Sequence, residues 1–299
     1  MGRLLWTPPK ERVLASHMYR FMEEVNRRFN KNFVEYHPLW EWSVENIPDF
    51  WATVWDFVQI QASSSYTQVV DDLKKMPGAR WFLGAKLNFA KNLLRRRDEK
   101  TALLFKGEGQ PLRKVSYKEL YDSVSRISQA LRSLGIKPGD RVVGFMPNMP
   151  ETTMAMLAAT SLGAIWSSCS PDFGIKGVMD RFGQIQPKVL FTADGYFFKG
   201  KRFDSMERIR EISKQLPSLE RLVVVSYTQT PEIRDIPVAV YFEDFIKPYS
   251  PQEIEFEELP FEHPLYIMYS SGTTGLPKCM VQTAGGILIN HMKEHMLHV

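Results

Sequence analysis

Residues 265–278 read Leu-Tyr-Ile-Met-Tyr-Ser-Ser-Gly-Thr-Thr-Gly-Leu-Pro-Lys, an apolar segment followed by a segment rich in Ser, Thr and Gly. The apolar residues 265–269 predict a buried strand that runs directly into a loop. Gly272 and Gly275 let backbone N–H groups approach an anion closely. Lys278 adds a positive charge where phosphate charge would develop. Hydroxyl groups come from Ser270, Ser271, Thr273 and Thr274. We therefore predict a phosphate-binding loop at residues 270–278.

The spacing of this loop separates it from two common nucleotide loops. A Walker A loop has four residues between its glycines and a Ser or Thr after its lysine. Here the two glycines are three positions apart, and Cys279 follows Lys278. The G-x-G spacing of a kinase glycine-rich loop is also absent. A flexible Ser/Thr/Gly linker is the alternative, but linkers rarely follow a buried strand and end in Pro-Lys before another apolar stretch.

Upstream of the loop, from about residue 99, strand and helix patterns alternate. Ser116 and Glu119 form a capping box ahead of an amphipathic helix that closes at Gly135. Further helices are expected at residues 150–163, 175–186 and 205–216. Strands are expected at residues 141–146, 164–168, 188–192, 221–226 and 264–269. Strands separated by helices of this length indicate βαβ units, so we predict an α/β fold with a mainly parallel sheet.

The first 80 residues differ in composition from the remainder. Residues 1–81 hold six of the seven tryptophans. Met18, Phe21, Met22, Val25 and Phe29 repeat at helical spacing, and Pro48 opens a second amphipathic helix. No convincing strand pattern occurs here. We predict a helical cap over residues 1–98, whose aromatic residues serve packing, followed by the α/β domain over residues 99–299.

Composition limits the classes of partner. With 38 basic and 34 acidic residues the net charge is +4, which does not argue for nucleic acid. The longest apolar run, residues 154–166, is broken by Thr160, Ser161 and Gly163, so no membrane insertion is expected. The N-terminus has no secretory hydrophobic region. Cys169 and Cys279 are expected to be free, buried thiols, and the protein to be cytosolic.

The motif YSSGTTGLPK, residues 269–278, matches the signature loop of the adenylate-forming superfamily, which includes acyl-CoA synthetases, peptide-synthetase adenylation domains and luciferases. The resemblance implies ATP, Mg²⁺ and CoA as small-molecule reactants. The loop would hold the β- and γ-phosphates while a carboxylate attacks the α-phosphate, and CoA would then displace AMP from the acyl-AMP. The implied phosphate-binding residues are Ser270, Ser271, Gly272, Thr273, Thr274, Gly275 and Lys278.

Longer stretches narrow this resemblance. Residues 37–57 and 81–94 look like the N-terminal region of the acetyl-CoA synthetase branch. Residues 163–191 and 267–298 are similar to the acetoacetyl-CoA synthetase family within it. Gln282 departs from the pattern, which has His there, so any role for this position is in doubt. Two alternatives stay open: an acetyl- or propionyl-CoA synthetase, and a non-catalytic nucleotide-binding fragment.

A basic segment follows Asp194-Gly195. By resemblance to the acetyl-CoA synthetase branch, Lys199, Lys201 and Arg202 are candidates for contacts to CoA phosphates; the alternative is a solvated basic turn. Residues 95–97 are three arginines beside two acidic residues and are interpreted as a solvated linker. His291 and His295 are one helical turn apart, but the H-E-x-x-H order is absent, so a packed or exposed helical pair is expected rather than a metal site.

The resemblance also implies what lies downstream of this stretch in the family. The adenine and ribose motifs, the acidic Mg²⁺ ligand, the acyl pocket and the catalytic lysine all follow this loop in the superfamily. We therefore expect no catalytic residue and no metal site in these 299 residues, and no ligase activity from this chain alone. The sequence predicts no particular oligomeric state.

Overall fold

The computed structural model describes residues 5–271 and 275–299, so Gly272, Thr273 and Thr274 of the predicted loop lie outside the described residues. The chain divides into two compact units. One unit comprises the residues up to Lys86 together with Gly285–Val299, and the other comprises Leu87–Ala284. Each unit is described on its own below.

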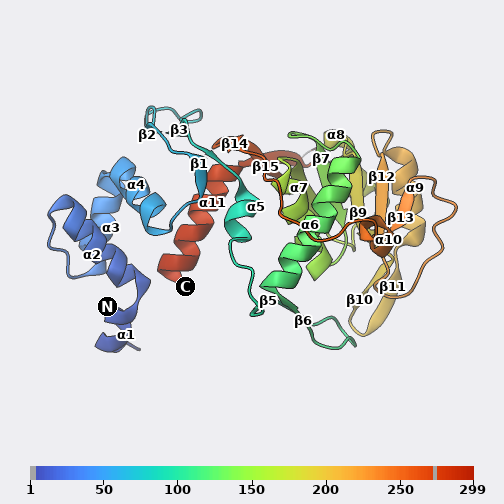
Figure 1. Cartoon of the computed structure of the whole chain (residues 1–299), viewed down its shortest axis with the longest axis horizontal. Coiled ribbons are helices and arrows are strands. Elements are labelled where there is room, and N and C mark those ends of the chain that lie inside the picture. The colour runs from blue at the N-terminus through green and yellow to red at the C-terminus, as the bar shows by residue number, and fades with distance from the viewer. Residues whose placement is uncertain (1–4, 272–274) are drawn as a thin grey trace. The chain divides into compact units, whose positions relative to one another are not determined.

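The larger unit is built on a seven-stranded sheet (Figure 1). Its strand order is β13-β12-β9-β7-β8-β15-β16. The first six strands are parallel and β16 is antiparallel to β15, which confirms the predicted mainly parallel sheet. The strands are β7 (Arg141–Phe145), β8 (Ile165–Cys169), β9 (Val189–Ala193), β12 (Arg221–Val225), β13 (Ala239–Tyr241), β15 (Pro264–Ser270) and β16 (Lys278–Thr283).

Helices cover both faces of this sheet, as a buried parallel sheet requires. They are α5 (Phe89–Leu93), α6 (Tyr117–Ser133), α7 (Pro150–Ser161), α8 (Ile175–Ile185), α9 (Met206–Gln215) and α10 (Phe242–Ile246). Helices α8 and α9 share a core with alternate residues of β7, β9 and β12, including Phe145, Leu190 and Leu222. The intervening residues point to the other face, where Phe191 meets Phe245 of α10. The predicted capping box is confirmed. The hydroxyl of Ser116 accepts a hydrogen bond from Glu119 N, and the carboxylate of Glu119 accepts one from Ser116 N.

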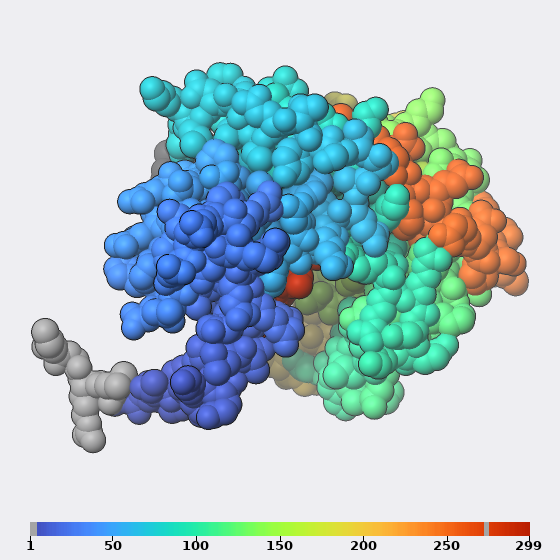
Figure 2. Space-filling model, turned by 60° about the vertical axis from the view of Figure 1, so that its left-hand side comes forward, coloured from blue at the N-terminus to red at the C-terminus, as the bar shows by residue number. Residues whose placement is uncertain are grey.

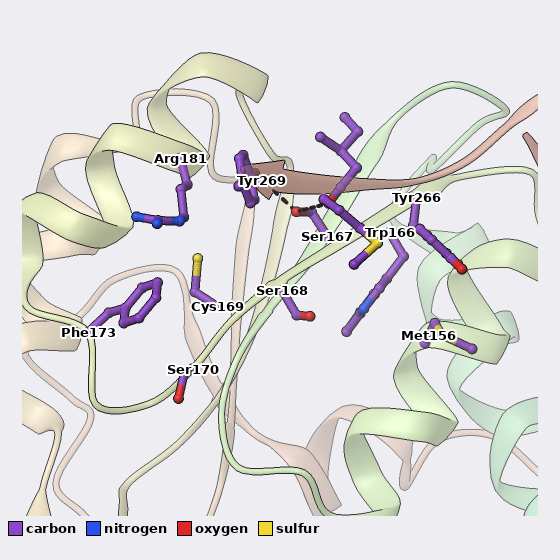
Figure 3. Close-up of a pocket in the computed structure, with 12 residues that line it drawn as sticks. Met156, Trp166, Ser167, Ser168, Cys169, Ser170, Phe173, Arg181, Tyr266 and Tyr269 are labelled. Carbon is purple, nitrogen blue, oxygen red and sulfur yellow. Dashed lines mark hydrogen bonds between the residues drawn. The ribbon is translucent and has the colours of Figure 1, made fainter. Parts of the chain in front are cut away.

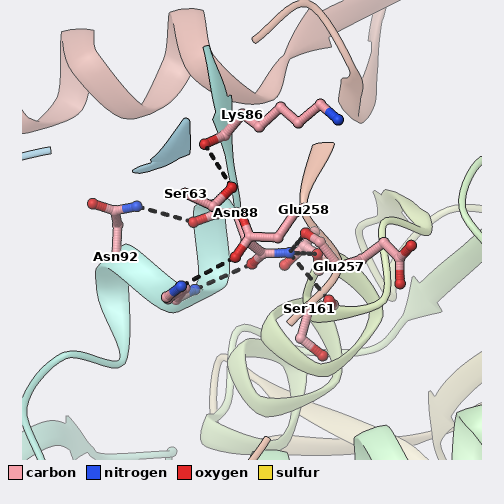
Figure 4. Close-up of polar contacts among 9 residues, drawn as sticks. Ser63, Lys86, Asn88, Asn92, Ser161, Glu257 and Glu258 are labelled. Atoms are coloured by element: carbon pink, nitrogen blue, oxygen red, sulfur yellow. Dashed lines mark hydrogen bonds and ion pairs between the residues drawn. The ribbon is translucent and has the colours of Figure 1, made fainter. Parts of the chain in front are cut away.

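A single buried amide joins three segments of this unit. Asn88 is fully buried and caps α5 by accepting from Lys91 N at 3.1 Å. Its Nδ2 donates to the carbonyl oxygens of Thr160 (3.2 Å), Ser161 (3.1 Å) and Glu257 (2.9 Å). Figure 4 shows the amide aimed between the end of α7 and the segment at Glu257 and Glu258, which precedes β14 (Leu259–Pro260). Because buried carbonyls need donors, this one side chain fixes where the three segments meet.

Two hairpins extend the larger unit. The first pairs β5 (Thr101–Phe105) with β6 (Arg113–Ser116), and the second pairs β10 (Gly195–Phe198) with β11 (Lys201–Asp204). The short strand β14 (Leu259–Pro260) precedes β15. The second hairpin follows β9, so it starts at the carboxyl edge of the sheet, where open α/β folds bind ligands.

The smaller unit is mainly helical. It contains α1 (Lys10–Ala15), α2 (His17–Phe29), α3 (Tyr36–Glu45), α4 (Ile47–Phe57), α11 (Ala284–Lys293) and a terminal π-helix, Glu294–His298. The helices predicted around Met18–Phe29 and after Pro48 are confirmed as α2 and α4. Red atoms of the carboxyl-terminal segment are visible against the blue helices in Figure 2, and His17 Nδ1 lies 3.1 Å from Met296 O.

The expectation that the N-terminal region, residues 1–98, lacks strands is wrong. The structure contains β1 (Ala62–Ser64), β2 (Gln68–Val70), β3 (Trp81–Leu83) and β4 (Lys86–Leu87). Each has three residues or fewer, too short for a period-two pattern to be recognised. Some of the aromatic residues here are packed as expected, since Trp55 stacks on Phe82 at 4.7 Å and Phe21 meets Phe57 edge-on at 5.3 Å, whereas Trp6 and Trp40 are exposed. Within residues 5–271 and 275–299, no helix has the length and apolar character that crossing a membrane requires.

Candidate functional site

The predicted loop is held at both ends by one hairpin. Strand β15 ends at Ser270 and β16 begins at Lys278, and these two residues are partners in the antiparallel ladder. Directly paired residues project from the same face of a hairpin. The hydroxyl of Ser270 and the ammonium of Lys278 therefore start from one face, at the two ends of the loop. The pairing thus brings the two ends of the predicted loop together.

The loop residues that the structure describes are accessible. Ser271, Gly275 and Lys278 are exposed, and Ser270 is half-buried. Gly275 has φ +89°, in the left-handed region where a side chain is strained. A glycine is thus required where the chain turns back toward β16. Strand β16 itself was not predicted, because its residues 278–281 are exposed and do not alternate between apolar and polar.

A pocket of about 430 Å³ opens beside this hairpin, between β8, β15 and α8 (Figure 3). Its walls combine bulky apolar groups with serine hydroxyls and one guanidinium. Trp166, Met156 and Tyr266 lie toward one side in Figure 3, and Arg181, Phe173 and Cys169 toward the other. The pocket-lining strands are central, parallel strands, and the loop continues directly from one of them. Strand β15 therefore both lines the pocket and leads into the loop.

Hydrogen bonds fix the carboxyl-terminal end of β15, just before the loop. Ser167 is buried, and its hydroxyl contacts Ile267 O at 2.8 Å and Tyr269 Oη at 3.0 Å. Arg181 Cζ lies 4.5 Å from the ring centroid of Phe173 and 5.7 Å from that of Tyr269. Burial raises the pKa of Tyr269, so its phenol stays protonated near neutral pH. Arg181 is therefore the cationic group of a largely aromatic wall.

Room for Trp166 in this wall depends on a glycine in the neighbouring strand. A Cβ at Gly144 would lie 2.8 Å from Cζ2 of Trp166 and 3.0 Å from Cη2. Trp166 is nine-tenths or more buried, so its indole has little freedom to move away. Gly144 thus sets the position of the largest side chain of the pocket.

The basic segment predicted for CoA is a tight hairpin turn. Lys199 and Gly200 both have positive φ, +53° and +73°, and connect β10 to β11 as a two-residue turn does. The backbone N–H groups of this turn already have an anionic partner. Lys199 N and Gly200 N donate to the two carboxylate oxygens of Glu108, at 3.1 and 2.7 Å. The side chains of Lys199, Lys201 and Arg202 are exposed.

The structure separates the predicted site residues into two groups. Ser270, Ser271, Gly275 and Lys278 share the β15–β16 hairpin, whereas Lys199, Lys201 and Arg202 share the β10–β11 hairpin. Sequence reasoning missed Ser167, Arg181 and Glu108, because each has a partner far away in the chain, Tyr269 for the first two and the turn at Lys199 for the third. The serine-rich segment 167–170 after a predicted strand was the available signal for the pocket.

Two other expectations hold only in part. Residues 95–97 are exposed and lie outside any helix or strand, as expected of a linker. Arg97 has structural partners nonetheless, since its guanidinium binds both carboxylate oxygens of Glu253 at 2.7 Å and lies 3.9 Å from the ring centroid of Tyr121. Burial also lowers the pKa of Arg95. Both cysteines are free, as predicted, but Cys279 is exposed rather than buried because it lies on the edge strand β16.

The histidines form no metal centre in the part of the chain that the structure describes. His291 and His295 are neighbours with ring centroids 6.4 Å apart. Burial and the proximity of His295 lower the pKa of His291. No cluster of three His, Cys, Asp or Glu side chains suited to a metal ion occurs among the described residues.

Comparison with known proteins agrees with this geometry. Residues 89–298 match the family described as AMP-binding enzyme, and residues 36–93 match the acetyl-coenzyme A synthetase N-terminus. The chain is 47% identical to acetoacetyl-CoA synthetase of Danio rerio over 99% of this chain and 45% of the relative. It is 45% identical to acetoacetyl-coenzyme A synthetase of Rhizobium meliloti (strain 1021), over the same shares of the two chains.

A solved structure is similar as well. Acetoacetyl-CoA synthetase from Streptomyces lividans superposes with a TM-score of 0.92 at 38% identity, covering 98% of this chain and 45% of that chain. The chain thus spans a little under half the length of the relatives it matches. A parallel sheet that ends in a clamped Ser/Thr/Gly loop, together with a family match over residues 89–298, places the chain in the family of AMP-binding enzymes.

Proposed function

We propose that the protein containing this chain joins acetoacetate, or a similar short carboxylic acid, to CoA in an ATP-dependent reaction. The acid first attacks the α-phosphate of ATP to give acyl-AMP and pyrophosphate, and the thiol of CoA then displaces AMP. The observation that carries this proposal is the pairing of Ser270 with Lys278 at the neck of the loop, at the end of a strand that lines the 430 Å³ pocket.

In this proposal the loop binds the outer phosphates of ATP. Lys278 meets developing charge on the leaving pyrophosphate, and its anchoring to β16 supports this role because little reorganisation is needed during the reaction. Ser270 and Ser271 donate from the other end of the loop. Gly272, Thr273, Thr274 and Gly275 complete the set by resemblance to the superfamily. No residue of this chain is assigned as the catalytic lysine.

Lys199, Lys201 and Arg202 are proposed to meet phosphates of CoA. The support is their exposure and clustering on one hairpin at the carboxyl edge of the sheet. Because Glu108 occupies the backbone donors of the turn, binding would come from the three side chains. Mg²⁺ is expected to accompany ATP, but no acidic cluster among the described residues fits it, and no step is derived from it.

Three further expectations stay predictions. The protein is expected in the cytosol. The functional boundary between the N-terminal region and the AMP-binding domain is expected near residue 98. The acid could also be acetate or propionate, since the acyl pocket of the superfamily is formed downstream of this loop.

The test is a comparison of acids on the full-length protein. Acyl-CoA formation would be measured with acetoacetate, acetate, propionate and butyrate in the presence of Mg-ATP and CoA. We expect the largest kcat/KM for acetoacetate. A clear preference for acetate would replace acetoacetate in the proposal, and absence of ATP–pyrophosphate exchange with every acid would overturn it.

A further inference from the structure

The carboxylate of Asp194 is buried at the carboxyl edge of the sheet. Asp194 follows β9 directly and is only 1% exposed. It accepts from the backbone N–H groups of Tyr227 at 2.6 Å, Thr228 at 2.8 Å and Gln229 at 3.0 Å, and from the hydroxyl of Thr228. A buried carboxylate is costly unless donors replace its water. All four donors belong to the loop after β12, so Asp194 fixes that loop.

Gln229 connects this loop to the basic hairpin. Its side-chain Oε1 accepts from Nη1 of Arg202 at 2.8 Å, and its Nε2 lies 3.4 Å from Oδ2 of Asp204. The amide thus sits between a cation and an anion of β11. Because Gln229 N is itself bound to Asp194, one chain of hydrogen bonds runs from the buried carboxylate to the exposed guanidinium.

The base of the hairpin closes tightly beside the backbone of Asp194. A Cβ at Gly195 would lie 2.3 Å from Phe203 O, so only glycine fits beside Asp194. The backbone N–H of Ser205 donates to the backbone carbonyl oxygen of Asp194 at 2.8 Å. The ring of Tyr227 meets Phe197 of β10 edge-on, with centroids 5.7 Å apart. The loop after β12 and the hairpin are therefore held against each other.

We propose that Asp194 and Gln229 are positioning residues for CoA, which hold the guanidinium of Arg202 in place before the ligand arrives. This inference rests on the proposed CoA-binding role of the hairpin. An exposed arginine loses side-chain entropy when it binds a phosphate, and holding it beforehand reduces that cost. Lys201 is the matched comparison, since no hydrogen bond or ion pair of its side chain occurs within the described residues.

The main test is a pair of double-mutant cycles in the full-length protein. Gln229 is exposed, so Gln229→Ala is not expected to disturb folding. We expect Gln229→Ala to raise the KM for CoA roughly three- to tenfold, the effect of losing one hydrogen bond, without changing kcat or the KM for ATP. In the Arg202→Ala background the same change should have no further effect, whereas in the Lys201→Ala background it should keep its full effect.

The outcomes separate this inference from the function on which it rests. If Arg202→Ala leaves the KM for CoA unchanged while ligase activity persists, Arg202 does not bind CoA. Both the assignment of Arg202 to CoA and its positioning by Asp194 and Gln229 are then overturned. If Arg202→Ala raises the KM for CoA but Gln229→Ala does not, or if Gln229→Ala acts equally without Arg202, only the positioning role is overturned. Thr228→Val removes the hydroxyl donor to Asp194 at similar volume and should raise the KM for CoA by a smaller factor. An unchanged value there would overturn the role of Asp194.

Discussion

Ser270 and Lys278 form the last pair of the β15–β16 ladder, so the two ends of the predicted loop, residues 270–278, are fixed at the same position of the sheet. The ammonium of Lys278 is therefore positioned by a strand rather than by the loop. Its neighbour Cys279 pairs with Tyr269 and projects from the opposite face of the strand. The two adjacent side chains thus have different surroundings, which makes them a matched pair for mutagenesis.

Replacing Lys278 by alanine should slow formation of the acyl-adenylate far more than formation of the thioester. The lost charge contact acts on the leaving phosphates, and pyrophosphate has departed before CoA reacts. We expect a loss on the order of 2–4 kcal/mol in the first step. ATP–pyrophosphate exchange measures that step, and turnover of supplied acyl-AMP with CoA measures the second.

Cys279→Ser serves as the control for Lys278→Ala, because it changes the next residue of the same exposed strand. Both half-reactions should stay near their original rates in Cys279→Ser. An equal loss of both half-reactions in Lys278→Ala would contradict the assignment of Lys278 to the outer phosphates of ATP.

Gly144→Ala should destabilise the larger unit and disturb the pocket. The added methyl group would meet the indole of Trp166 at 2.8 Å inside a packed wall, and overpacking of this kind costs about 1–3 kcal/mol. Gly183→Ala is the matched control. Gly183 is exposed in α8, and its Cβ would have Met179 Cε at 3.6 Å as the nearest neighbour, so a gain of roughly 0.5–1 kcal/mol is expected. Denaturant unfolding measures the change in the free energy of unfolding for both variants. Equal changes in Gly144→Ala and Gly183→Ala would refute the packing argument.

The elements that were predicted from the sequence are those whose signal is local. The capping box at Ser116 and Glu119 and the left-handed Gly135 after α6 depend on neighbours within a few positions. The parallel order follows from the alternation of strands and helices. Strand β16 was missed because an exposed edge strand carries no burial pattern. The predicted loop was located by composition, whereas its clamp depends on a pairing that composition does not encode.

The contacts of the site were beyond sequence reasoning for a different reason. Glu108 meets Lys199 N across 91 positions, and Ser167 meets Tyr269 across 102. Neither pair has a spacing rule, since the partners come together only after the sheet has formed. The ion pair of Arg97 could not be predicted for the same reason, because Glu253 lies 156 positions from it in the chain.

The two cysteines should differ sharply in reactivity. Burial raises the pKa of the Cys169 thiol to about 12, so almost none of it is thiolate at pH 8. Cys279 is exposed on β16. An aromatic disulfide reagent should therefore titrate one thiol quickly in the native protein and two after denaturation. Cys279→Ser should abolish the fast phase, and a fast phase that survives this change would contradict the burial of Cys169.

The raised pKa of Cys169 also predicts a loss of stability in alkali. The folded state keeps the thiol protonated up to about pH 12, whereas the unfolded chain ionises near its ordinary pKa of 9.0. The contribution of this thiol to stability is full below pH 9 and is lost as the pH rises toward 12. Cys169→Ala should reduce the fall in unfolding free energy over that interval. An unchanged pH profile would show that the thiol is not linked to folding.

Asn88→Asp should weaken the larger unit in a manner that depends on pH. Nδ2 of Asn88 donates to three carbonyl oxygens, and an ionised carboxylate would repel all three while removing this donor from each of them. The cost at pH 7 should be on the order of 3–5 kcal/mol. Burial favours the neutral acid, which regains one donor, so the folded-state pKa of the new side chain should be raised. The penalty should therefore shrink as the pH falls from 7 toward 5 and grow as the pH rises.

Asn148→Asp makes the same chemical change at an exposed position of the same unit and should have little effect at either pH. Urea unfolding of both variants at the two pH values provides the measurement. A penalty for Asn88→Asp that matched Asn148→Asp, or that did not change with pH, would mean that the buried amide does not hold the three segments together.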